Sequence, residues 1–186
     1  TWEITRHCNL HCTHCLSRDQ LKLCDDELSY DECLRLIDDL IEAGVFQINV
    51  GGGEPFMRSD IWDILDYCHE REMVTCVSTN GSKIDRKAAE RLANMKFMYM
   101  QLSLDGATEE TNDAIRGKWT YQMAIKAIQN LYHAGFKNLS INTVVTAKNF
   151  RELPDLYVLA KKYNAKTRLS RFRPSGGGAE MWDEYA

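Results

Sequence analysis

Six times along the chain, a short apolar segment with strand character is followed by polar or small residues, and all but the last by helical periodicity. Strands that alternate with helices pair in parallel and place their helices outside the sheet. Six units are too few for a closed eight-stranded barrel. The pattern predicts an α/β fold built as a partial (β/α)6 TIM-like barrel, with a doubly wound open sheet as the alternative. The predicted strands cover 2–6, 46–50, 73–78, 97–104, 139–145 and 166–172, and the predicted helices 29–43, 60–71, 86–95, 109–115, 121–134 and 151–163.

Local signals set several helix ends. Ser29 and Glu32 have the spacing of a capping box, and Gly44 is a typical residue just past a helix. Asn149 is predicted to cap the last helix. The apolar stripe expected on the first helix is formed by Leu34, Ile37, Leu40 and Ile41.

Composition excludes several classes of function. The 186 residues carry a formal net charge of -4 and no basic run, which argues against binding of nucleic acid through its phosphates. No apolar stretch reaches the roughly 18 residues of a membrane helix, and we expect no signal peptide. Seven cysteines, an odd number, are untypical of a secreted disulfide scaffold. We therefore expect a cytoplasmic protein.

Three of the cysteines form a tight cluster directly after the first predicted strand. Cys8, Cys12 and Cys15 have the spacing Cys-x-x-x-Cys-x-x-Cys in what is expected to be a loop. Carboxyl ends of parallel strands are where α/β folds place their chemistry. Three thiols in one loop at that edge indicate a metal site rather than core packing.

The spacing leaves three metal sites open. A zinc site needs a fourth ligand, which a neighbouring histidine would supply: His7, His11 or His14. A four-cysteine cluster would need Cys24, at a spacing unlike the usual ferredoxin runs. A [4Fe–4S] cluster held by three thiolates would leave one iron free for an exogenous ligand.

A second motif favours the third site. Gly52-Gly53-Glu54-Pro55 follows the second predicted strand, and with the cysteine triplet it resembles the radical S-adenosylmethionine (radical SAM) superfamily. The resemblance implies that Cys8, Cys12 and Cys15 bind the cluster and that the open iron chelates S-adenosylmethionine. Reductive cleavage then gives a 5′-deoxyadenosyl radical, so the cofactors supply the chemistry. It also implies a radical SAM core over residues 1–174.

Within that superfamily, the chain is similar to the mycofactocin maturases. The similarity lies in residues 1–3, 50–55, 78–81, 103–108 and 171–176. It implies oxidative decarboxylation of the C-terminal tyrosine of a ribosomal precursor peptide and its crosslinking to the preceding valine. It implies a small peptide-binding partner protein and an external electron donor. Residues 175–186 are then expected to begin a linker to a C-terminal domain with auxiliary iron–sulfur clusters.

The same resemblance assigns cofactor contacts to the strand ends. Gly52, Gly53 and Glu54 are expected at the methionine end, although a plain tight turn explains the glycines equally simply. His14 stands where family members usually carry an aromatic residue facing the adenine. The ribose or methionine contacts are expected from Ser78, Asn80 and Ser103, the last in preference to Asp105. Asn-Gly and Asp-Gly turns are the alternative explanation there.

The later strands add further candidates. Arg116 is expected to pair with a carboxylate of the cofactor or substrate. The alternative for Arg116 is a surface ion pair with Glu109, Glu110 or Asp113. Strand residues expected to reach the barrel interior are Asn142, Val144 and Arg171. If Arg171 points outward instead, it serves solubility.

Two competing functions remain open at this point. Another radical SAM maturase, forming thioethers, a quinone cofactor or a modified tetrapyrrole, would carry the same core. A non-enzymatic iron–sulfur or zinc module would need only the cysteines.

Overall fold

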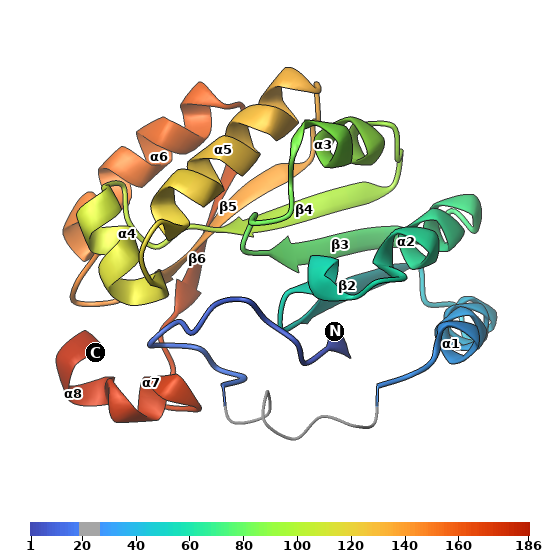
Figure 1. Cartoon of the computed structure of the whole chain (residues 1–186), viewed down its shortest axis with the longest axis horizontal. Coiled ribbons are helices and arrows are strands. Elements are labelled where there is room, and N and C mark those ends of the chain that lie inside the picture. The colour runs from blue at the N-terminus through green and yellow to red at the C-terminus, as the bar shows by residue number, and fades with distance from the viewer. Residues whose placement is uncertain (19–26) are drawn as a thin grey trace.

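The computed structural model of the chain describes residues 1–18 and 27–186, and it confirms the partial barrel. Six parallel strands lie side by side in sequence order, β1 to β6 (Figure 1). A doubly wound sheet would reverse strand order at a switch point, and this sheet does not. The strands are β1 Trp2–Thr5, β2 Gln47–Gly52, β3 Val74–Thr79, β4 Met98–Ser103, β5 Leu139–Val145 and β6 Lys166–Arg171.

The longer helices lie along the outer side of the curved sheet (Figure 1). In the part of the chain that the structure describes, no helix is long and apolar enough to span a membrane. The helices are α1 Tyr30–Glu42, α2 Ile61–Glu70, α3 Arg86–Ala93, α4 Glu109–Arg116, α5 Thr120–His133, α6 Leu153–Lys162, α7 Gly177–Glu180 and α8 Trp182–Tyr185. Two 3₁₀ turns, η2 Pro55–Met57 and η3 Phe150–Glu152, precede α2 and α6.

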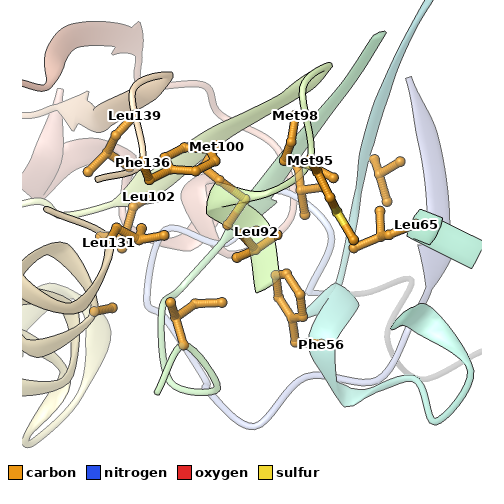
Figure 2. Close-up of a cluster of buried hydrophobic side chains, with 14 of the residues drawn as sticks. Phe56, Leu65, Leu92, Met95, Met98, Met100, Leu102, Leu131, Phe136 and Leu139 are labelled. Carbon is orange, nitrogen blue, oxygen red and sulfur yellow. The ribbon is translucent and has the colours of Figure 1, made fainter. Parts of the chain in front are cut away.

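The main hydrophobic core fills the space between the sheet and these helices (Figure 2). Every second residue of β4 faces it, so Met98, Met100 and Leu102 are buried. Helix residues such as Leu65 and Leu131 pack against them from α2 and α5. This layer fixes the strands from one side and leaves their carboxyl ends to form the site.

Two local predictions need correction. The Ser29–Glu32 capping box and the left-handed Gly44 after α1 are confirmed, but Ile41 is exposed and Cys33 takes its place in the core. Asn149 does not cap a helix. Its amide instead donates to the carbonyl oxygens of Asp105 and Val144, because it is fully buried at the ends of β4 and β5.

The sixth unit is also more structured than predicted. Helices α7 and α8 follow β6 and pack beside the cysteine loop, the segment after β1 that carries Cys8, Cys12 and Cys15 (Figure 1). Gly177 N donates to Cys15 O at 2.8 Å, and the hydroxyls of Thr13 and Tyr185 lie 3.0 Å apart. Residues 175–186 are therefore packed against the core, and the further domain expected beyond them stays a prediction.

Candidate functional site

The cysteine loop runs from the end of β1 across the carboxyl ends of the strands (Figure 1). Its middle residue, Thr13, donates from both N and Oγ1 to Ile115 O, each at 3.0 Å. The loop is thus fastened to the last turn of α4. A segment of irregular backbone needs such partners to hold three side chains in one place.

The three thiols of this loop are partly buried and close enough that each one's charge acts on the pKa of another. Burial raises the pKa of Cys8, Cys12 and Cys15 above that of an ordinary thiol. The neighbouring Arg116 lowers the pKa of Cys12 against this effect. Because metals bind thiolates, a cation would displace three protons here.

The glycine loop, residues 51–54 at the end of β2, lies directly on the backbone of β1 and of the residues just after it. Gly53 N donates to Thr5 O at 2.8 Å, and Glu54 N donates to His7 O at 2.8 Å. Gly52 has φ +109°, and a Cβ there would lie 2.2 Å from Thr5 O. A Cβ on Gly53 would lie 2.2 Å from His7 O. The close approach therefore requires glycine at both positions.

This contact predicts a contrast between two neighbouring substitutions. Gly53→Ala is expected to destabilise the protein by about 1–3 kcal/mol, because the methyl group would overlap the backbone of the cysteine loop. Gly51→Ala is the matched control, since nothing lies within 4 Å of its Cβ position. Thermal unfolding without cofactors measures both. Equal midpoints for the two variants would contradict the close packing.

Glu54 is buried and joins the glycine loop to the end of β3. Its carboxylate accepts from Thr79 Oγ1 at 2.8 Å, Asn80 N at 2.7 Å and Phe56 N at 3.3 Å. Burial raises the pKa of Glu54, although these hydrogen bonds act in the opposite direction. The carboxylate is occupied by protein donors, so its first role is to hold two strand ends in register.

A buried ion pair lies behind the cysteine loop, and the sequence did not reveal it. Asp105 is fully buried, and its Oδ2 lies 2.6 Å from Arg116 Nε and 2.9 Å from His14 Nε2. Its Oδ1 accepts from Val144 N at 2.7 Å. Burial by itself would raise the pKa of Asp105, but Arg116 and His14 lower it to about 2. The carboxylate is therefore ionised at neutral pH.

Arg116 therefore pairs with a carboxylate of the protein itself, and its expected contact with a carboxylate of the cofactor or substrate stays a prediction. It is buried, and its Nη1 lies 4.0 Å from Cys12 Sγ while its carbonyl accepts from that thiol at 3.8 Å. It does not form the surface ion pair with the acidic residues of its own helix. An arginine eleven positions after an aspartate carries no periodic signal, and only the Asp-Gly turn marked the position.

The site residues gather around one hollow of about 360 Å³. The glycine loop and the ends of β3, β4 and β5 form its walls opposite the cysteines. Of the site residues predicted from the sequence, Arg171 alone is absent from this lining, while Ser103 borders the hollow and Asp105 lies behind it. The lining includes Cys8, Cys12, His14, Cys15, Gly52, Gly53, Glu54, Ser78, Asn80, Ser103, Arg116, Asn142 and Val144.

The three thiols are a donor set that suits iron, because iron–sulfur clusters are held by cysteine thiolates. In a four-iron cluster each thiolate binds a different iron, so three thiols leave one iron for another ligand. Among residues 1–18 and 27–186, no three Cys, His, Asp or Glu side chains stand ready to hold a single metal ion. Cys24, considered as a fourth thiolate, lies outside the described residues.

Comparison with known proteins agrees with this geometry. Residues 2–160 match the Radical SAM superfamily. The chain belongs to the radical SAM superfamily. Both sequence motifs that indicated the family line the same hollow in the structure.

Individual relatives extend the comparison. The chain is 45% identical to a "Mycofactocin maturase MftC" of Mycolicibacterium smegmatis, over 99% of this chain and 47% of that protein. It is 36% identical to an "Fe-coproporphyrin III synthase" of Methanosarcina barkeri, over 87% of this chain and 40% of the relative. The chain thus spans about half the length of the curated relatives it matches or less.

A solved structure shares the fold. Streptococcus suis SuiB, crystallised with its precursor peptide SuiA, superposes with a TM-score of 0.82 at 22% identity. The match covers 92% of this chain and 38% of SuiB. At this identity the likeness shows the fold of a radical SAM partial barrel.

Proposed function

We propose that this chain is the catalytic core of a radical SAM enzyme that modifies a ribosomally made precursor peptide. One observation carries the proposal. The cysteine triplet and the glycine loop line a single hollow, in a chain 45% identical over 99% of its length to a mycofactocin maturase. The proposed reaction is the mycofactocin type: oxidative decarboxylation of a C-terminal tyrosine and its crosslinking to valine.

Different residues of the hollow are proposed to bind the cluster and S-adenosylmethionine. Cys8, Cys12 and Cys15 hold the [4Fe–4S] cluster as thiolates. When bound, the cluster supplies the electron that cleaves S-adenosylmethionine to a 5′-deoxyadenosyl radical. The glycine loop borders the same hollow, and the methionine end of S-adenosylmethionine would lie against it. Arg116 places a positive charge beside Cys12, where it stabilises the thiolate.

Polar side chains at the strand ends surround the rest of that molecule. Ser78, Asn80 and Ser103 offer hydroxyl and amide groups to a ribose diol or to the methionine carboxylate. Asn142 and Val144 close the wall from β5, and His14 borders the same hollow. These assignments are proposals that rest on the lining and on the family.

Other parts of the proposal concern the whole protein. We place it in the cytoplasm, where thiols and an oxygen-sensitive cluster stay reduced. A small peptide-binding protein presents the precursor, and an external donor supplies electrons. Auxiliary clusters belong to a C-terminal domain of the kind that the longer relatives have room for.

Electron paramagnetic resonance tests the core of this proposal. The protein, reconstituted anaerobically with iron and sulfide and then reduced, is expected to show a [4Fe–4S] signal that shifts when S-adenosylmethionine is added. Cys12→Ala removes one ligand and is expected to lose the signal. Cys76→Ala is the control, because that buried thiol lies outside the lining of the hollow. A zinc-only protein, or a cluster that ignores S-adenosylmethionine, would exclude the radical reaction.

A second candidate substrate class is supported by similarity to the Fe-coproporphyrin III synthase and, at 30–32% identity, to "AdoMet-dependent heme synthase" proteins. Incubation with either the precursor peptide or Fe-coproporphyrin III distinguishes the two. Mass spectrometry that shows a decarboxylated peptide supports the peptide maturase. Conversion of the porphyrin alone would replace it with the tetrapyrrole enzyme.

A further inference from the structure

A second hollow, of about 470 Å³, lies beside the first along β5 and β6. The two share part of their walls, including His14 and Asn142. Ser170 of β6 donates to Asn142 Oδ1 at 2.8 Å, which joins the strands between the two spaces. Since β6 is the last strand of the sheet, the second hollow lies at the edge of the barrel, next to the first.

The second hollow is strongly basic. Arg168, Arg171 and Arg173 all line it, and its lining contains neither aspartate nor glutamate. Within the described residues, none of the three has an ion-pair partner. Acidic side chains outnumber basic ones in this chain, and five arginines elsewhere are paired with carboxylates: Arg18, Arg58, Arg71, Arg91 and Arg116.

One residue of the shared wall, His14, is held in place by the buried carboxylate of Asp105. The His14 side chain is 5% exposed, and its Nε2 is held by Asp105. Its Nδ1 is buried without a hydrogen-bond partner among the described residues. The fixed His14 side chain thus gives the two hollows a common wall.

We propose that the second hollow binds the terminal carboxylate of the substrate peptide through the arginines that line it, Arg168 and Arg171 of β6 and Arg173 just after that strand. Guanidinium groups match a carboxylate with two parallel hydrogen bonds, which gives both attraction and orientation. Held there, the last residue of the peptide lies next to the hollow assigned to S-adenosylmethionine. The inference rests on the proposed function. It assigns Arg171 to substrate binding instead of cofactor binding.

The test compares two forms of one peptide. Full-length, cluster-loaded enzyme, with the small peptide-binding partner protein present, is titrated with fluorescently labelled precursor peptide ending in a free carboxylate or in a carboxamide. Loss of a charge-assisted pair is expected to weaken binding of the carboxamide by about tenfold or more. Arg168→Gln and Arg171→Gln are expected to bring this ratio close to one. Arg168→Lys keeps the charge without the planar fork and is expected to restore part of it.

Controls separate this inference from the proposed function. Arg35→Gln removes the same charge from the exposed face of α1 and is expected to keep the full ratio. The S-adenosylmethionine-induced change in the resonance signal is expected in Arg168→Gln as in the wild type, which also shows that the variant is folded and loaded.

The outcomes are distinct. If wild-type enzyme modifies the peptide but binds both forms equally, the carboxylate site is wrong while the proposed function stands. The same holds if the arginine variants keep the full ratio. If the wild type binds neither form, or its cluster ignores S-adenosylmethionine, the proposed function fails and this inference fails with it.

Discussion

Replacing Asp105 with alanine is expected to destabilise the fold by about 3–5 kcal/mol, the usual effect of removing one partner from a buried ion pair. The change leaves the Arg116 guanidinium buried without its counter-charge, and it frees His14 Nε2 and Val144 N. For a domain of this size the loss corresponds to a fall of roughly 10 °C in the unfolding midpoint. Because His14 and Arg116 adjoin the cysteines, the variant is also expected to retain less iron after reconstitution.

A double substitution tests whether the unpaired buried charge causes the loss of stability. Asp105→Leu together with Arg116→Met removes both buried charges, and replacing such a pair by apolar groups is often neutral for stability. The double variant is therefore expected to regain most of the lost stability, although Cys12 now loses its neighbouring cation. Asp31→Ala, at an exposed position in the first turn of α1, controls for loss of an acidic side chain. An Asp105→Ala protein that unfolds with the wild type would refute the role given to this pair.

Much of the fold was predictable because its signals are local. Period-two and helical patterns placed β5 at its observed bounds and the other strands within a few residues. Parallel pairing then brings every strand's carboxyl end to one edge, so residues as distant as Cys8 and Asn142 were expected together. Residue type and topology sufficed for this part of the site.

The remaining features depend on burial and on contacts between distant segments. Asp105 and Asn149 follow strands and resemble ordinary turn residues. Both are nevertheless fully buried, and the Asn149 amide donates to the Asp105 carbonyl oxygen. Nothing in their spacing indicates which side chain covers them. Arg171 was expected either to reach the barrel interior or to face outward, and it borders the second hollow at the end of β6. The glycines after Ser175 suggested only a linker.

Those glycines lead to the second large effect. Gly176 has φ +55°, and a Cβ there would lie 2.3 Å from Leu16 O and 2.6 Å from Cys15 O. Gly176→Ala therefore combines a left-handed backbone, unfavourable by about 1–2 kcal/mol, with overlap against the cysteine loop worth about 1–3 kcal/mol more. The loop and α7 cannot both keep their positions. We expect a lower unfolding midpoint and a large loss of bound iron per protein.

Gly135→Ala separates strain from overlap. Gly135 follows α5 with φ +77°, but nothing lies within 4 Å of its Cβ position. It is expected to lose only the strain energy and to keep its iron, because the cysteine loop is not displaced. Iron content and thermal unfolding of the two variants, measured in parallel, decide the matter. If both lose stability equally and both retain iron, then the segment after β6 does not support the cysteine loop, whereas selective iron loss in Gly176→Ala makes residues 175–186 part of the cluster-binding structure.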